Sequence, residues 1–169
     1  LEIMEARWLF DMPPEKIQVV VHPQSIVHSA LEFADGAVIA QLGTPDMRLP
    51  ILYAMTYPQR WPTGGRPLDL FALGQLTFEP GDPQRFPALR LAGECLNAGG
   101  AACAILNGAN EAAVAAFLRE EIPFGGIVRL VEGALERLGQ LPANSLADIF
   151  DADAQARRVV AELLPSVRS

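Results

Sequence analysis

A stretch rich in proline and glycine, from Tyr57 to Pro87, separates two halves of the sequence that differ in character. Regular helices and central strands do not continue through repeated proline, because proline lacks the backbone N–H group that both structures need. The stretch is long for a loop, so we expect a connector that wraps over the surface with only short strand or turn segments. The sequence therefore predicts three parts, at residues 1–56, 57–86 and 87–169.

The first half has the pattern of a short helix followed by strands. Residues 1–10 favour a helix that ends before Pro13-Pro14. Residues 17–21 form a β-rich run, and residues 50–55 favour a second short helix. Because the chain opens without methionine, as though partway into a helix, we expect it to be a fragment of a longer protein.

A β-hairpin is the clearest local signal of the first half. Strand-forming residues at 25–31 and 37–42 flank Asp35-Gly36, and Asp-Gly is a strong hairpin turn because both residues tolerate positive φ. Apolar residues occur on both faces of this hairpin. We therefore expect both faces to be covered, one of them by the second subunit of a homodimer.

The second half is dominated by helical patterns that predict a small bundle. Alanine-rich residues 112–116 favour helix strongly. Asn107-Gly108 predicts a break, after which Asn110 would cap the next helix, and Asp151 predicts another N-cap. The predicted helices span residues 87–98, 101–106, 109–121, 125–138 and 151–164. The fold class is α+β: part of a central domain with a small, mostly antiparallel sheet and helices, then a C-terminal helical bundle.

Composition narrows the possible partners. The net charge is −7 and the sequence has no run of lysine or arginine, which argues against nucleic acids and anionic membrane surfaces. No apolar run approaches the roughly 18 residues of a membrane span. Cys95 and Cys103 lack a CxxC spacing and are predicted to be buried thiols, which suits a reducing cytoplasm.

Three groups of residues could carry chemistry. Glu2 and Glu5 share a helix face, where they could serve acid–base or hard-metal chemistry, or simply face solvent. His22 and His28 are the only histidines, and each could be structural or adjacent to a substrate. Met47, in a loop after a strand, could offer a polarisable surface to a flat ring, or belong to an ordinary turn.

A polar cluster at Asn107, Asn110 and Glu111 lies in the helical half. Capping and interhelical hydrogen bonds account for these side chains without any catalytic role. From the residues alone, the chain is an α+β fragment of undetermined activity.

Several motifs, in order over nearly the whole chain, resemble 1-deoxy-D-xylulose 5-phosphate reductoisomerase. They are Glu5-Ala-Arg-Trp-Leu-Phe10, His22-Pro-Gln-Ser25, Gln41-Leu-Gly43, Pro45-Asp-Met-Arg48, Pro67-Leu-Asp69, Leu76-Thr-Phe78, Leu106-Asn-Gly-Ala-Asn-Glu111 and Ala113-Val-Ala-Ala-Phe117. The resemblance covers the C-terminal portion of that family, namely part of the central catalytic domain and the helical domain.

The resemblance implies an NADP-dependent oxidoreductase of non-mevalonate isoprenoid biosynthesis. Such an enzyme converts the phosphosugar 1-deoxy-D-xylulose 5-phosphate to 2-C-methyl-D-erythritol 4-phosphate with NADPH and Mn²⁺ or Mg²⁺. The family's Asp-Ser-Glu metal motif is absent from this sequence, so both cofactors would need residues upstream of Leu1. We expect the chain to be inactive alone; the alternative is a non-catalytic dimerisation or binding module derived from that family.

The resemblance also assigns candidate roles to individual residues. Glu2 matches the third metal carboxylate and a substrate contact, and Glu5 matches a glutamate adjacent to the catalytic site. His28 matches a histidine near the substrate, as catalytic and binding residue, and His22 a neighbouring substrate-binding position. The cofactor residues implied are Met47, facing the nicotinamide, with Pro45 and Gly43 in the same wall.

Overall fold

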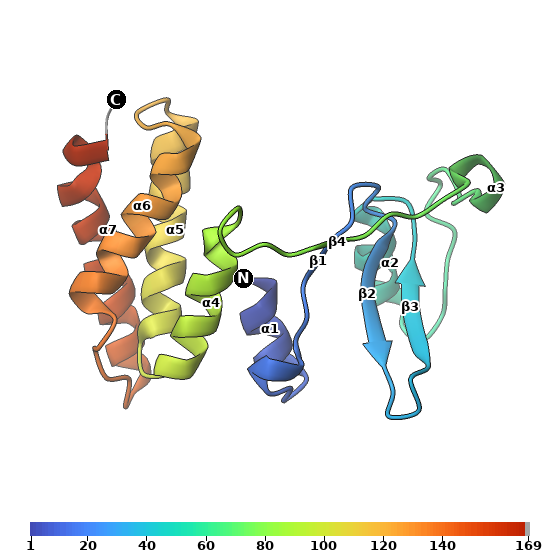
Figure 1. Cartoon of the computed structure of the whole chain (residues 1–169), viewed down its shortest axis with the longest axis horizontal. Coiled ribbons are helices and arrows are strands. Elements are labelled where there is room, and N and C mark those ends of the chain that lie inside the picture. Colours follow the sequence, from blue (N-terminus) through green and yellow to red (C-terminus); the bar gives the residue numbers. More distant parts are fainter. Residues whose placement is uncertain (168–169) are drawn as a thin grey trace. The chain divides into compact units, whose positions relative to one another are not determined.

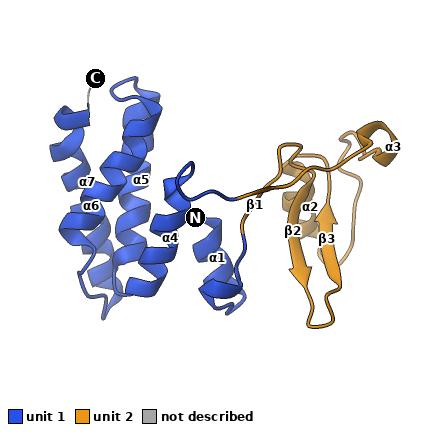
Figure 2. Cartoon of the chain, in the orientation of Figure 1, with its two compact units in different colours: residues 1–18, 81–169 blue, residues 19–80 orange. Residues whose placement is uncertain are grey.

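The computed structural model describes residues 1–167, which pack as two compact units (Figure 2). Unit 1 combines residues 1–18 with the chain from residue 81 onward, and unit 2 contains residues 19–80. Packing therefore joins the first helix to the C-terminal bundle. The three-part division at residues 56/57 and 86/87 concerns the domains of the complete protein and stays a prediction.

Unit 1 is helical and unit 2 holds the strands, which confirms the predicted α+β class (Figure 1). Unit 1 contains α1 (Glu2–Leu9), the 3₁₀ turn η1 (Pro14–Lys16), α4 (Pro87–Ala98), α5 (Ala102–Leu118), α6 (Phe124–Leu138) and α7 (Leu146–Val167). Unit 2 contains β1 (Val20–Val21), β2 (Val27–Glu32), β3 (Val38–Leu42), α2 (Arg48–Thr56), α3 (Leu70–Leu73) and β4 (Glu79–Pro80). Strands β1 and β4 pair antiparallel, as do β2 and β3.

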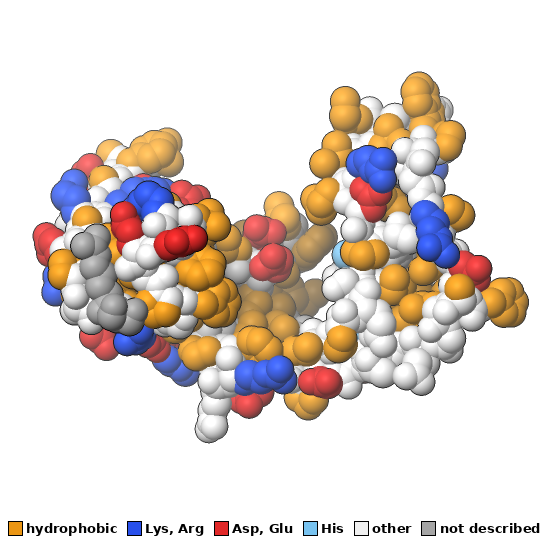
Figure 3. Space-filling view, turned by 90° about the horizontal axis from the view of Figure 1, so that it is seen from above, with side chains coloured by type: hydrophobic (Ala, Val, Ile, Leu, Met, Phe, Trp, Pro, Cys, Tyr) orange, Lys and Arg blue, Asp and Glu red, His pale blue; other side chains and the backbone are white. Residues whose placement is uncertain are grey.

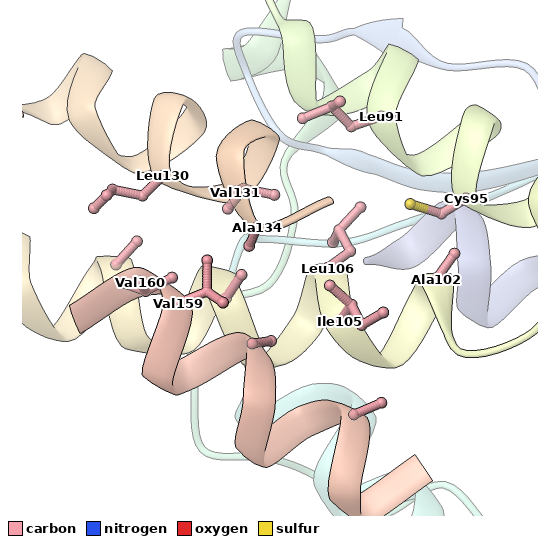
Figure 4. Close-up of a cluster of buried hydrophobic side chains, with 14 of the residues drawn as sticks. Leu91, Cys95, Ala102, Ile105, Leu106, Leu130, Val131, Ala134, Val159 and Val160 are labelled. Carbon is pink, nitrogen blue, oxygen red and sulfur yellow. The ribbon is translucent and has the colours of Figure 1, made fainter. Parts of the chain in front are cut away.

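The core of unit 1 forms around α5, which packs against α4, α6 and α7, while α1 packs against α4 (Figure 1). Ile105, Leu130 and Val160 are its largest fully buried side chains, and they come from three different helices (Figure 4). Buried alanines such as Ala109 and Ala156 allow the helix backbones to approach closely. The bundle predicted from the helical patterns is confirmed.

The predicted break at Asn107-Gly108 is wrong, because α5 runs unbroken from Ala102 to Leu118. A Cβ atom on Gly108 would lie 2.5 Å from Oδ1 and 3.2 Å from the backbone oxygen of Asp153 on α7. The glycine thus allows close helix packing rather than ending a helix. Asn110 lies in mid-helix and does not act as a cap, which corrects that expectation too.

We expect Gly108→Ala to destabilise unit 1 by about 1–3 kcal/mol, because the added methyl group overlaps the Asp153 carboxylate and backbone. Gly93→Ala on α4 is the matched control, since a Cβ there meets nothing within 4 Å. The control should stabilise the helix by up to about 1 kcal/mol. Urea unfolding of both variants measures the difference, and equal midpoints would contradict the packing argument.

Helix α7 begins at Leu146, five residues before the predicted cap at Asp151. Ser145 and Asp148 cap it reciprocally: the Asp148 N–H donates to Ser145 Oγ at 3.2 Å, and the Ser145 N–H donates to Asp148 Oδ2 at 2.9 Å. The Asn144 N–H also donates to Asp148 Oδ2, and these hydrogen bonds hold the pKa of the Asp148 carboxyl below its usual value. This capping box is the true start signal of the helix.

The hairpin of unit 2 is confirmed, with β2 and β3 joined at Asp35-Gly36. Gly36 has φ +83°, and Asp35 Oδ1 accepts a hydrogen bond from the Ala37 N–H at 3.0 Å. The strand register shifts between Val27 and Ser29, so His28 occupies a β-bulge. The bulge interrupts the side-chain alternation of β2 at His28.

Large apolar side chains of this hairpin are exposed. Leu31, Val38 and Ile39 each keep more than 60% of their surface accessible. Apolar side chains also lie at the surface of both units (Figure 3). The predicted covering of the hairpin by a second subunit stays a prediction.

Candidate functional site

Helix α1 carries the two candidate carboxylates of unit 1. Met4, which is buried, anchors the helix, while Glu2 and Glu5 are exposed. The Glu2 side chain keeps 94% of its surface accessible and lies 3.2 Å from the chain's own terminal amino group. Hydrogen bonds from its own backbone N–H and from that amino group hold the pKa of the Glu2 carboxyl below its usual value. Glu2 is thus an ionised oxygen donor at neutral pH.

The described residues do not form a complete metal site. A hard cation such as Mg²⁺ prefers oxygen ligands, and the Glu2 carboxylate is of that type. Within residues 1–167, however, no three histidine, cysteine, aspartate or glutamate side chains gather as a metal cluster. The donor chemistry of Glu2 is that of a ligand for a divalent cation, but the described residues gather no cluster of further ligands around it.

His22 has definite partners inside unit 2. Its Nδ1 atom lies 2.7 Å from the Thr77 carbonyl oxygen, and since a carbonyl can only accept, Nδ1 carries the hydrogen. Its ring stacks on Phe78 with centroids 4.6 Å apart and an interplanar angle of 17°. The remaining ring nitrogen, Nε2, is buried and has no hydrogen-bond partner in residues 1–167.

Gln24 strengthens the same attachment. Its Oε1 atom accepts hydrogen bonds from the Thr77 N–H at 3.3 Å and from Thr77 Oγ1 at 3.1 Å. Together with His22, it attaches the His22-Pro-Gln motif to Thr77 of the connector, and we call this set of contacts the clasp. Thr77 is 55 residues from His22, so local sequence patterns could not reveal the pairing.

His28, Gly43 and the loop that follows β3 lie at one end of the hairpin. Val27 pairs with Leu42, and the Gly43 N–H donates to the Ile26 carbonyl oxygen at 3.0 Å. His28 sits on the bulge at this end and is exposed. Bulges redirect side chains and are frequent beside active sites.

The loop after β3 presents an apolar side chain to solvent. Gly43 is buried, and a Cβ there would lie 3.2 Å from Gln41 Nε2, so glycine keeps the loop close to the strand. Pro45 is exposed and Met47 keeps 70% of its surface accessible. Antiparallel pairing thus brings His28 to the same end of the hairpin as this loop, whereas Glu2 and Glu5 belong to unit 1.

The cysteines do not form a reactive site. Cys95 and Cys103 are free thiols of unit 1; Cys95 is buried as predicted, whereas Cys103 is only half-buried. Burial, with a smaller contribution from Cys103, raises the pKa of the Cys95 thiol to about 12. It is therefore protonated at neutral pH and a poor nucleophile.

The polar motif around Asn107 has a structural role in unit 1. The Arg157 guanidinium on α7 donates to Glu111 Oε2 at 2.6 Å and to Asp153 Oδ2 at 2.7 Å. Glu111 also accepts a long hydrogen bond from Asn107 at 3.5 Å. This network ties α5 to α7, which agrees with the interhelical hydrogen bonds expected from the sequence.

One surface concavity lies apart from the predicted site residues. A concavity of about 340 Å³ between α4 and α6 is lined by charged side chains that include Arg90, Glu94 and Glu132. Arg90 already pairs with both glutamates.

Across residues 1–167, no helix has the length and apolarity needed to cross a bilayer.

A family model, the DXP reductoisomerase C-terminal domain, matches residues 42–159. The chain belongs to this family. The match includes the Met47 loop, the connector and most of the helical bundle, and it confirms the resemblance seen in the sequence motifs.

Curated members of the reductoisomerase family extend the similarity to the rest of the chain. The 1-deoxy-D-xylulose 5-phosphate reductoisomerase of Dechloromonas aromatica is 54% identical over 168 residues, which is 99% of this chain and 42% of the relative. The enzyme of the same name from Aromatoleum aromaticum is 55% identical over 159 residues, 94% of this chain and 40% of the relative. The chain therefore spans about two fifths of the length of the curated relatives it matches.

Solved structures of reductoisomerases share the fold. The Zymomonas mobilis enzyme in complex with NADPH superposes with a TM-score of 0.86 at 45% identity, over 96% of this chain and 43% of that one. A DOX-P reductoisomerase in complex with NADPH, fosmidomycin and magnesium gives a TM-score of 0.89 at 40% identity, over 97% and 42%.

Proposed function

We propose that this chain is the C-terminal portion of a reductoisomerase that converts 1-deoxy-D-xylulose 5-phosphate to 2-C-methyl-D-erythritol 4-phosphate with NADPH and Mg²⁺ or Mn²⁺. The observation that carries the proposal is the 54% identity to a reductoisomerase across 99% of the chain. Solved relatives in complex with NADPH and with magnesium support the choice of cofactors. The protein would work as a homodimer in the cytoplasm.

In this proposal Glu2 is one oxygen ligand of the divalent cation and touches the substrate through it. The cation would supply Lewis-acid polarisation of the substrate ketone and hold its hydroxyl groups for carbon migration. The terminal amino group that now pairs with Glu2 would be a peptide nitrogen in a longer chain, which would leave the carboxylate oxygens available. Glu5, an exposed residue of the same helix, would act beside Glu2 as a general acid or base.

The end of the hairpin opposite its turn, where His28 and the loop after β3 lie, would bind the organic ligands. Met47, with Pro45 and Gly43, would form an apolar wall for the nicotinamide ring and exclude water from it. The exposed imidazole of His28 would contact the substrate. His22 would contribute only through Nε2, because Nδ1 is already held by the Thr77 carbonyl.

The complete protein and the 169-residue chain should differ sharply in activity. We expect the complete protein to oxidise NADPH when 1-deoxy-D-xylulose 5-phosphate and Mn²⁺ are present, as followed at the absorbance of the reduced nicotinamide. The 169-residue chain should show no turnover and bind Mn²⁺ no more tightly than about 1 mM, since a lone carboxylate is a weak ligand. Turnover by the 169-residue chain alone would contradict the proposal that the activity needs the rest of the complete protein. A complete protein without turnover would favour a non-catalytic binding module.

Dimerisation through the β2–β3 hairpin would account for the exposed apolar side chains of this hairpin. We expect light scattering to give the mass of a dimer for the complete protein, and Ile39→Asp to shift it towards monomer by placing a charge in the interface. Leu118→Asp, at a residue of unit 1 that is 74% exposed, is the control and should leave the mass unchanged. A monomeric wild-type protein would remove the dimer from the proposal.

A further inference from the structure

Asp46 and Arg48, which flank Met47 in the sequence, form an ion pair. The Arg48 side chain donates from Nε to Asp46 Oδ2 at 2.9 Å and from a terminal nitrogen to the same oxygen at 2.6 Å. Asp46 Oδ1 also accepts the backbone N–H of Arg48 at 3.0 Å. The Asp46 carboxylate thus binds both the side chain and the backbone of Arg48. Met47 lies in the short loop that these hydrogen bonds close.

Hydrogen bonds fix the backbone before and after Met47, whereas its side chain is exposed to solvent. The Asp46 N–H donates to the Thr44 carbonyl at 2.7 Å, and the Met47 carbonyl accepts from the Ile51 N–H at 3.2 Å in the first turn of α2. Met47 keeps 70% of its surface accessible. The loop therefore fixes where the thioether starts without covering it.

The connector packs against the Asp46–Arg48 ion pair. A Cβ on Gly65 would lie 3.3 Å from Asp46 Oδ2 and 3.5 Å from an Arg48 guanidinium nitrogen, so only glycine fits there without a tight contact. Thr44 Oγ1 also contacts the Arg66 carbonyl oxygen at 3.4 Å. The Asp46 side chain is 27% exposed, against 67% for Arg48, so the acidic half of the pair is the sheltered one.

We propose that Asp46 and Arg48 are positioning residues that hold the Met47 backbone so that its thioether faces the nicotinamide ring of NADPH. The inference rests on the proposed NADPH-dependent function and adds two residues to it. An ordinary surface ion pair contributes little to stability. Losing this one should therefore change cofactor binding far more than it changes unfolding.

The test uses the complete protein, with NADPH binding measured by fluorescence titration and KM measured for both substrates. Asp46→Ala should weaken NADPH binding about fivefold, whereas Asp46→Asn, which keeps an acceptor for the Arg48 N–H, should weaken it less. The KM for the phosphosugar should stay within about twofold. Asp82→Ala is the matched control, because Asp82 Oδ1 accepts the backbone N–H of Gln84, two residues on, in the same way at 2.8 Å, and it should leave NADPH affinity unchanged.

A double-mutant cycle separates positioning from an independent contribution. If Asp46 acts through Met47, then Asp46→Ala should add little to the loss caused by Met47→Ala. Additive losses, or an Asp46→Ala variant with normal NADPH affinity beside a weakened Met47→Ala, would overturn the inference and leave the proposed function standing. A wild-type protein that does not bind NADPH would overturn both.

Discussion

Glu2→Gln should lower turnover of the complete protein roughly 100-fold or more, because an amide oxygen is a weaker cation ligand than a carboxylate. The fold should be unaffected, since the Glu2 side chain is 94% exposed and α1 is anchored by Met4 instead. Steady-state NADPH oxidation gives the loss in rate. Titration with Mn²⁺, followed by its paramagnetic resonance signal, gives the loss in metal affinity independently.

Glu15→Gln is the control for this experiment, because it removes another exposed carboxylate of unit 1 that no metal role is assigned to. The control should retain full activity and metal affinity. Near-normal turnover of Glu2→Gln at saturating Mn²⁺ would refute the metal role of Glu2. A loss of turnover with unchanged Mn²⁺ affinity would place Glu2 at the substrate rather than at the cation.

Leu130→Ala should destabilise unit 1 by about 2–5 kcal/mol, because Leu130 is wholly buried between helices and its truncation leaves a cavity. Leu118→Ala removes the same atoms from a side chain that is 74% exposed, so its effect should stay within about 0.5 kcal/mol. Urea unfolding compares the two, and hydrogen exchange of the α5 amides localises the change. Similar losses for both variants would contradict the assignment of the core.

Local signals were sufficient for the elements that depend on neighbouring residues. Asp35-Gly36 predicted the hairpin because a tight turn needs a residue with positive φ, and Gly36 has it. Pro87, at the first turn of α4, marked the start of the helical half correctly. The Ser-x-x-Asp spacing of the Ser145–Asp148 capping box is a local signal of the same kind, and it marks the start of α7 ahead of Asp151.

Features that depend on distant residues could not be predicted in this way. Gly108 resembles a helix break until Asp153 is seen packed against it. The Thr77 partner of His22 lies 55 residues away, and the bulge at His28 exists only relative to β3. The candidate site came from family motifs rather than from spacing, because Glu2 and Met47 carry no local mark of a metal or cofactor role.

The pairing of β1 with β4 brings the entrance and exit of unit 2 together, with Val20 opposite Pro80. Unit 2 is therefore an insertion between α1 and α4 whose two ends meet at a strand pair, and the clasp of His22 and Gln24 on Thr77 closes it just inside that pair. A segment closed in this way can lengthen or shorten between its ends without altering how the surrounding helices pack. Changes of length in the loops of unit 2 can thus leave the helical bundle unchanged.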